Sequence, residues 1–470
     1  MASSGTHHCL YRLIPVLSGS RKMAPHHDVS NSQKSKGHTS QNSASFAGFL
    51  HYPTNRDNSL KTSHTWISGK RIDDDVGPYW RIHNKLYDLT DFIDKHPGGK
   101  DWLLATKGTD ITEAFESAHI STAAENTLPK YYAKDISTPR NSPYTFHDDG
   151  FYKMLKRKVR PILKKVGRGP TWSMVVLQDS FALTFMLLTV AACLTESYTL
   201  VILAGIVLGM TGNCAHNFFH QRDNWRMYYF DLMLFSSYDW RISHGLSHHL
   251  YTNTIYDIEI SALEPIWEFL PKSDKSFMKR YGSWIYEQFI MPMALFIEAV
   301  KRIYHQYSGD MKLRPENLLP VVEFILMAVV SSSVGMAFRL WVVLHMACSY
   351  WFAAIGVVVA HHHPDIYHQG DAMREDKDWG LCQLDAVRDR VEVTGNLFLV
   401  SISFGDHSLH HLFPTVDHSK LPYIYPVFME TCKEFGVPFK FMRTSELIIG
   451  KYLQLAKNTP NVNPPGYKSS

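Results

Sequence analysis

The stretch Trp240–Thr254, WRISHGLSHHLYTNT, contains His244, His248 and His249, and the rest of the chain is best interpreted from it. Residues three and four positions apart lie on one face of a helix, so a helix here would direct these imidazoles towards one side. A single histidine is more often an ordinary core or surface residue. The prediction of a metal site therefore depends on whether other clusters accompany this one.

Two further histidine clusters have the same helical spacing. His216 and His220 are four residues apart, and the third cluster combines His407 with His410 and His411. Together the three clusters supply eight imidazoles, too many for a closed structural zinc site with its four ligands. Neutral imidazole suits iron, and eight imidazoles suit two open transition-metal ions. We therefore predict one metal site assembled from three distant segments.

The order of the clusters, HxxxH, HxxxHH and HxxHH, resembles that of the membrane fatty-acid desaturases. The flanking residues agree, because LYTNT follows His249 and LFP follows His411. The resemblance implies a di-iron centre held by the eight cluster histidines and by a ninth just beyond the last membrane span. The triplet His361–His363 occupies that place. We expect His361 to be the ninth ligand, with His362 as the alternative, because consecutive residues point in different directions.

A second motif, HPGG at His96–Gly99, precedes His119 in the context WRIHNKLYDLTDFIDKHPGG followed by TEAFESAHIST. This context resembles the cytochrome b5 family, whereas HPGG alone would indicate only a turn. The resemblance implies that His96 and His119 bind the iron of haem b axially, as neutral imidazoles that face each other across the macrocycle. The apolar residues expected to form the walls of the haem pocket are Leu89, Phe92, Leu103, Leu104, Ile111 and Phe115.

Length and composition indicate several units in this 470-residue chain. Residues 1–60 are rich in Ser, His, Asn and Gln and are predicted to be a disordered tail. We expect the haem unit at 61–139, a basic linker at 140–171, the desaturase-like domain at 172–436 and a C-terminal segment and tail at 437–470. The six cysteines form no CxxC pair, which favours a reducing environment over a disulfide framework.

Apolar stretches predict membrane-spanning helices, because each is long enough to cross a bilayer of about 30 Å. The predicted spans are 172–194, 198–215, 318–338 and 340–360. They would form two hairpins, the second turning at Phe338 and Arg339. The segment Lys153–Arg168 has eight Lys/Arg and no acidic residue, which marks the cytosolic side. All histidine clusters then lie on that side.

The expected fold class is therefore multi-domain. A small α+β cytochrome b5 haem domain would precede an all-α integral membrane desaturase domain with four transmembrane helices and a cytosolic histidine-rich cap. Two further stretches mix apolar and charged residues: Trp225–Tyr238 is predicted to be an interfacial helix, and Ser283–Val300 to be interfacial or re-entrant. Asp257 and Glu259 are either hydrogen-bond partners of the ligating imidazoles or plain loop acids.

The two resemblances imply an oxidoreductase in which haem passes electrons to a di-iron centre that desaturates a fatty acyl chain with dioxygen. The expected partners are an acyl-lipid or acyl-CoA substrate, membrane lipid and a separate NADH-cytochrome b5 reductase, since no convincing GxGxxG unit is present. The acidic surface at 73–125 would attract a basic partner. The expected location is the endoplasmic reticulum membrane, multi-pass, with the haem domain and both termini cytosolic. Nucleic acid is not an expected partner.

Two other functions remain open at this point. A lipid hydroxylase would use the same centre, and a membrane-anchored cytochrome b5-type electron carrier would have an inactive desaturase-like part. Front-end desaturases that carry a fused haem domain usually begin the third cluster with Gln. Here His407 stands at that position, which argues against front-end regiochemistry.

Overall fold

The structure is a computed structural model that describes residues 48–262, 264–356 and 360–466. Most of the predicted disordered tail, residues 1–47, lies outside the described residues. The described chain begins with a small α+β region and continues into a mostly helical region, as expected from the sequence.

The α+β region is built on a three-stranded antiparallel sheet. Its strands are β1 (Trp80–Ile82), β2 (Lys85–Tyr87) and β3 (Tyr132–Asp135), in the order β1-β2-β3. His83 turns the chain between β1 and β2 with a positive φ of 53°. The helices of this region are α1 (Ser63–Asp74), α2 (Lys100–Thr106), α3 (Thr112–Ala118) and α4 (Ala123–Thr127). Trp80, Ile82, Tyr87, Leu89, Leu103, Ile111 and Phe115 form its apolar core.

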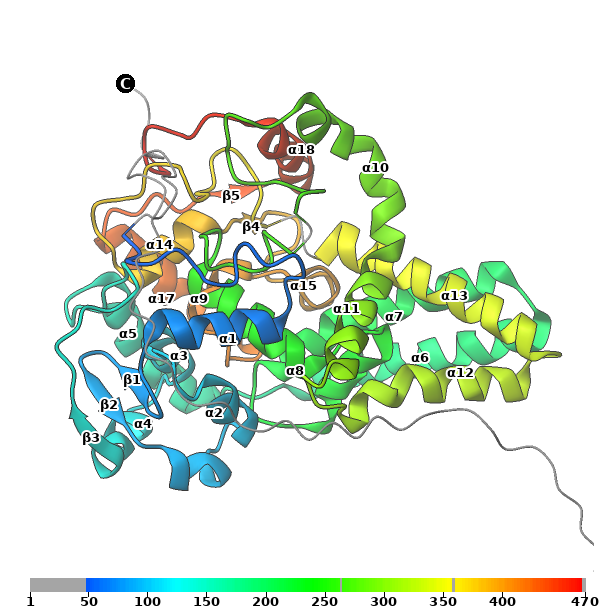
Figure 1. The fold of residues 1–470 in the computed structure, drawn as a ribbon, viewed down its shortest axis with the longest axis horizontal. Coiled ribbons are helices and arrows are strands. Elements are labelled where there is room, and N and C mark those ends of the chain that lie inside the picture. Colours follow the sequence, from blue (N-terminus) through cyan, green and yellow to red (C-terminus); the bar gives the residue numbers. More distant parts are fainter. Residues whose placement is uncertain (1–47, 263, 357–359, 467–470) are drawn as a thin grey trace, which may run out of the picture. The chain divides into compact units, whose positions relative to one another are not determined.

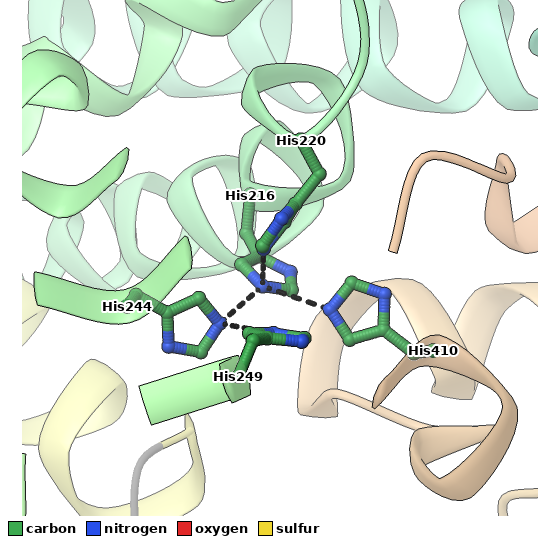
Figure 2. Close-up of side chains that lie close together, drawn as sticks. All are labelled: His216, His220, His244, His249 and His410. Atoms are coloured by element: carbon green, nitrogen blue, oxygen red, sulfur yellow. Dashed lines mark hydrogen bonds between the residues drawn. The ribbon is translucent and has the colours of Figure 1, made fainter. Parts of the chain in front are cut away.

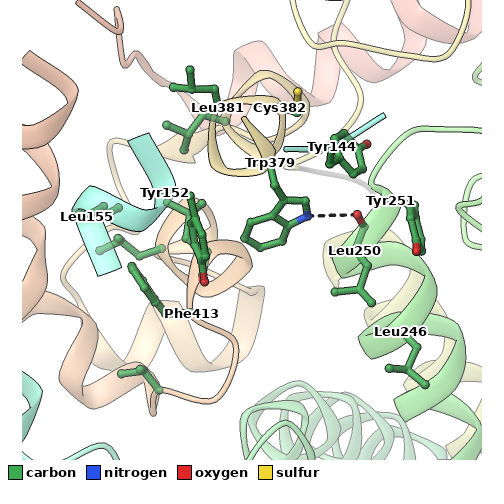
Figure 3. Close-up of a cluster of buried hydrophobic side chains, with 14 of the residues drawn as sticks. Tyr144, Tyr152, Leu155, Leu246, Leu250, Tyr251, Trp379, Leu381, Cys382 and Phe413 are labelled. Atoms are coloured by element: carbon green, nitrogen blue, oxygen red, sulfur yellow. Dashed lines mark hydrogen bonds between the residues drawn. The ribbon is translucent and has the colours of Figure 1, made fainter. Parts of the chain in front are cut away.

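The basic segment after this region forms an amphipathic helix, α5 (Phe151–Val166). Its apolar face packs against α14 (Trp379–Ala386) and α17 (Leu421–Glu434). Figure 3 shows part of this core, in which the indole nitrogen of Trp379 donates to the carbonyl oxygen of Leu250 at 3.2 Å. Several of the basic side chains are paired within the chain, so the helix joins the two regions through both apolar and charged contacts.

Three helices among the described residues are long and apolar enough to cross a membrane. They are α6 (Trp172–Thr195), α7 (Tyr198–Phe219) and α13 (Val334–Trp351). The apolar helical segment that includes α13 continues to Ala354. The three helices run side by side with the shorter α12 (Leu319–Val330), as Figure 1 shows. A side chain at Gly205 of α7 would collide with the backbone carbonyl of Leu344 in α13, so glycine permits this close helix packing.

The second hairpin differs from the sequence prediction. The turn lies at Ser331–Ser333, not at Phe338 and Arg339, and Ser333 caps α13 by accepting from the backbone N–H of Met336. The predicted break was wrong because a serine cap outweighs one arginine in deciding where a helix begins. As a result α12 has 12 residues, fewer than a full span, while α13 begins earlier than expected.

The two stretches predicted to be interfacial are short, interrupted helices. Trp225–Met233 is a 3₁₀ helix followed by α8 (Ser237–Trp240). The other stretch divides at Met291–Met293 into α10 (Ser283–Ile290) and α11 (Ala294–Tyr307). The remaining elements are α9 (His249–Tyr251), α15 (Leu397–Ser403), α16 (His407–Leu412), α18 (Thr444–Ala456) and the parallel pair β4 (Asp389–Arg390) and β5 (Phe441–Met442).

Candidate metal and haem sites

Five of the predicted histidines form one buried cluster, shown in Figure 2. The Nε2 atom of His216 lies 2.8 Å from that of His244, 3.0 Å from that of His220 and 3.2 Å from that of His410. The Nε2 atom of His249 lies 3.0 Å from that of His244. The residues come from the end of α7, the π-helix Arg241–His248, α9 and α16, so three distant segments converge as the sequence predicted.

The other four predicted histidines form a second buried cluster. The Nε2 atom of His361 lies 3.1 Å from that of His248 and 2.6 Å from that of His407. The ring of His411 lies 4.8 Å from that of His361 between centroids, and its Nε2 atom has no hydrogen-bond partner among the residues that the structure describes. All nine histidines predicted from the sequence are thus divided between two neighbouring groups.

The chemistry of these groups fits two metal ions better than a hydrogen-bonded histidine core. In each cluster several Nε2 atoms converge, and a neutral imidazole has only one N–H to donate. Burial is the main cause that lowers the pKa of His249, His407 and His410 well below the usual value, and neighbouring imidazoles lower it further. These rings are therefore neutral, and their converging lone pairs need a cation, as metal ligation supplies.

Carboxylates orient two of the rings. The Nδ1 atom of His244 donates to Glu259 at 2.8 Å, and that of His248 donates to Asp257 at 2.9 Å. Burial alone would lower the pKa of His248, but the two carboxylates raise it to about 9. With Nδ1–H held by a carboxylate, Nε2 is the atom of each ring that faces the metal, and on His248 a bound metal would displace the proton that the raised pKa implies. Of the two interpretations open for Asp257 and Glu259, the geometry favours partners of the ligating rings.

Other partners were missed in the sequence. The Nδ1 atom of His411 donates to Gln383 at 3.1 Å, and that of His361 donates to the carbonyl oxygen of Ala386 at 3.0 Å. His418 lies 3.2 Å from the Nδ1 atom of His410. No motif around Gln383 points to its role, and a backbone carbonyl such as that of Ala386 cannot be recognised from the residue type. Only His418 could have been identified, because it follows the third histidine cluster closely in the sequence.

The triplet after α13 separates in the way expected for consecutive residues. His361 joins the second cluster, whereas the ring of His362 stacks on Phe269 and its Nδ1 atom lies 3.2 Å from Nε2 of His368. His363 accepts from the backbone N–H of Asp365 at 3.0 Å. The geometry therefore favours His361 over the alternative, His362, and the assignment of ligands stays a prediction.

The candidate haem ligands face each other across a cavity. The rings of His96 and His119 lie 6.1 Å apart between centroids. Their Nδ1 atoms are held by the carbonyl oxygens of Gly99 at 2.8 Å and Phe115 at 2.9 Å, which leaves both Nε2 atoms free. Burial is the main cause that lowers the pKa of His119 to about 4. The hydrogen bond to Phe115 raises this pKa, and the nearby His96 lowers it further. The pair thus has the geometry, and His119 the neutral form, suited to axial ligation of haem.

The cavity between these rings has a volume of about 660 Å³, within the range of about 300–1,000 Å³ typical of cofactor sites. Five of the apolar wall residues predicted from the sequence line it: Leu89, Phe92, Leu103, Ile111 and Phe115. The prediction of Leu104 was wrong, since its position on α2 turns the side chain outwards and leaves it 47% exposed. His220, Gly245 and Thr415 of the helical region line the cavity as well.

The turn of the HPGG motif also contacts the helical region. Gly99 has a φ of 106°, a conformation that favours glycine, and a side chain there would collide with the carboxylate of Asp223. Gly245 contacts Trp102, because a side-chain carbon at Gly245 would lie 3.1 Å from the indole ring. The same carbon would lie 3.9 Å from His220. His220 thus adjoins the contact between Gly245 and Trp102, lines the haem cavity and belongs to the five-histidine cluster.

Comparisons with known sequences agree with both sites. The profile described as "Fatty acid desaturase" matches residues 196–443, and that described as "Cytochrome b5-like Heme/Steroid binding domain" matches residues 67–157. The chain is 41% identical to the Cytochrome b5-related protein of Drosophila melanogaster, over 88% of this chain and 96% of the relative. It is 24% identical to Acyl-lipid (8-3)-desaturase B of Dictyostelium discoideum, over 83% and 93%. The chain belongs to the fatty acid desaturase family and carries a cytochrome b5 domain ahead of the desaturase region.

Proposed function

We propose that the protein is a membrane desaturase in which haem passes electrons, within one chain, to a di-iron centre that desaturates a fatty acyl chain. One observation carries this proposal: His220 belongs to the five-histidine cluster and also lines the cavity between His96 and His119. In an electron-transfer enzyme this arrangement would place the haem next to the metal centre, so that electrons could pass between them without a separate carrier.

The nine clustered histidines would hold two iron ions, and His96 with His119 would hold haem b. The iron ions would supply the activation of dioxygen that removal of hydrogen from an unactivated methylene group requires. The chain supplies position and exclusion of water. Each of the nine rings is buried, and Asp257 and Glu259 fix the orientation of His248 and His244 before any metal binds.

An acyl chain has a candidate binding site beside the metal cluster. A cavity of about 120 Å³ is lined by apolar side chains, among them Phe235, Trp240, Leu295 and Phe352, and by polar and charged ones such as Asp239, Glu298 and Arg302. Trp240 stacks on His244 with ring centroids 5.3 Å apart. An acyl segment in this cavity would be separated from the metal site only by the side chain of Trp240. We infer that the substrate is an acyl-lipid or acyl-CoA whose apolar tail enters here.

The same proposal places the protein in a membrane. Together α6, α7 and α13 supply three crossings. A fourth is proposed for α12 with the preceding 3₁₀ turn Pro315–Leu318, because a bilayer thins locally around a short helix. Both termini and the haem domain would be cytosolic in the endoplasmic reticulum, where NADH-cytochrome b5 reductase would reduce the haem.

Lipid analysis tests the proposed reaction. Cells that produce the wild-type chain should contain acyl chains with an additional double bond, and cells that produce the His407→Ala variant should not. Hydroxylated acyl chains would instead support the hydroxylase. No change in either product, from a protein with a normal haem spectrum and two bound iron ions, would contradict the proposal and favour an electron carrier.

A further inference from the structure

The haem cavity has an uneven distribution of charge along its wall. Arg168 and Arg222 line it, and no carboxylate does so among the residues described by the structure. Both arginines lie outside residues 67–157, the part that matches the cytochrome b5 profile. The helical region therefore supplies two permanent positive charges to a site whose iron ligands come from the α+β region.

The backbones that carry these arginines are held in place. The carbonyl oxygen of Arg168 accepts from the backbone N–H of Asp417 at 2.8 Å. The carbonyl oxygen of Arg222 accepts from the side chain of Asn224 at 3.0 Å. Buried Arg241 fixes the same loop, since it donates to Asp223 at 2.6 Å. The loops are thus positioned for a ligand before it binds.

The guanidinium groups themselves have no ion-pair partner among the described residues, unlike the neighbouring Arg160, which pairs with Glu125 at 3.0 Å. The charge of Arg168 also contributes, after burial and closer charges, to the low pKa of His119. Arg168 is therefore within electrostatic reach of a candidate axial ligand. Two unpaired arginines at the rim of an otherwise largely apolar cavity are complementary to a ligand with an apolar body and anionic ends.

Haem b has that chemistry, because two propionate carboxylates project from one edge of its apolar ring. We propose that Arg168 and Arg222 bind the propionates of the haem held by His96 and His119, so that the desaturase region completes the haem site. This inference rests on the haem-binding part of the proposed function. It implies that the propionate edge faces the desaturase region and its five-histidine cluster.

Haem loss from the full-length protein in detergent tests this orientation. Arg168→Gln and Arg222→Gln should each speed transfer of haem b to excess apomyoglobin by about fivefold, the effect of one partly exposed charge pair. They should also lower the midpoint potential, because the reduced haem carries one more negative charge than the oxidised haem. The axial spectrum should be unchanged. Lys165→Gln, an exposed position outside the cavity, is the matched control.

Reconstitution with haem dimethyl ester isolates the carboxylates, because the ester has no propionate charge. The arginine variants should lose the ester at the wild-type rate, and Arg168→Lys with Arg222→Lys should retain haem b better than the glutamine variants. Unchanged loss of haem b from the double glutamine variant would overturn the proposal, as would equal acceleration for the ester. If only binding to anionic lipid vesicles fell, the arginines would bind lipid headgroups instead. None of these measurements requires desaturase activity. The assignment of the arginines can therefore be contradicted while the proposed desaturase function holds, and the reverse is also true.

Discussion

The Nε2 atoms of His361 and His407 lie 2.6 Å apart, although the two residues are 46 positions apart in the chain. His361 follows the last membrane helix, and His407 begins α16. His361 thereby completes the second cluster of four histidines beside the cluster of five, so that two metal ions would have four and five nitrogen ligands. This relationship distinguishes His361 from its two neighbours.

His361→Ala should remove one of the two iron ions and abolish desaturation, because three histidines would remain in its cluster. His362→Gln should leave the iron content unchanged, since that ring packs on Phe269 and not in either cluster. Iron analysis of the purified variants, normalised to haem, measures the effect. Full iron content in His361→Ala would show that the ninth ligand lies elsewhere.

Asp257→Asn should weaken iron binding by about 10–100-fold, the usual cost of losing the partner of a metal-ligating histidine. The carboxylate accepts from His248 and also from the backbone N–H of Asn253 at 2.8 Å. Competition with a chelator gives the affinity. Asp274→Asn is the control, because Asp274 is exposed and distant from the clusters in sequence. Equal iron retention by both variants would contradict the orienting role.

The convergence of the three histidine clusters was predictable because each cluster has its own helical spacing. His244, His248 and His249 are adjacent on one turn whatever the tertiary structure. The hydrogen-bond partners of the imidazoles were harder to predict. Gln383 contacts His411 only in the folded chain, and no residue type in a sequence indicates that the backbone carbonyl of Ala386 accepts from His361. The contact of His220 with the haem cavity likewise depends on how two regions pack.

Glu116→Gln should lower the free energy of unfolding by about 3–5 kcal/mol, the cost of breaking a buried ion pair from one side. Glu116 lies 2.9 Å from Lys156 and 2.7 Å from Lys153, and both Glu116 and Lys156 are almost fully buried. Urea unfolding followed by haem absorbance measures the change. Glu125→Gln, which breaks a partly exposed pair with Arg160, should cost less than about 1 kcal/mol. Similar losses in both variants would mean that burial does not decide the effect.

Acidification should destabilise the protein between about pH 6.5 and pH 4. Burial lowers the pKa of His119 to about 4 and that of His368 to about 3, whereas unfolded histidine titrates near 6.5. Below pH 6.5 the unfolded chain binds more protons than the folded chain, so stability is complete above this pH and falls as the pH falls. Unfolding by urea at several pH values measures the slope. A stability that rises on acidification in this window would contradict these shifts.

The low-spin haem spectrum should persist at pH 5, because His119 in the folded protein stays neutral until the pH approaches 4. A pH titration of the visible spectrum, with free imidazole as a competitor in a parallel series, measures the loss of ligation. Loss of the low-spin spectrum with a midpoint near pH 6.5 would indicate that His119 is an ordinary solvated histidine.

The ends of the helices were harder to predict than the histidine clusters, because a capping residue can end or begin a helix inside an apolar stretch. The apolar stretch from Leu318 to Ala360 indicated two spans, but its division depends on three consecutive serines at Ser331–Ser333. The cap at Ser333 shortens α12, whereas Glu196 and Ser197 divide α6 from α7 between the predicted spans 172–194 and 198–215. The charged Arg339 lies inside α13, so a single charge in an apolar stretch did not mark the turn, whereas the small serines did.

The central claim is that haem electrons reach the histidine-bound metal centre within one chain. The most direct test is to reduce the haem without oxygen, mix the full-length protein with dioxygen and acyl substrate, and follow haem oxidation by stopped-flow absorbance. The proposed electron path predicts a rate independent of protein concentration, and strong slowing in His407→Ala despite an unchanged haem spectrum. Oxidation at the same rate in that variant, or at a rate proportional to protein concentration, would contradict it.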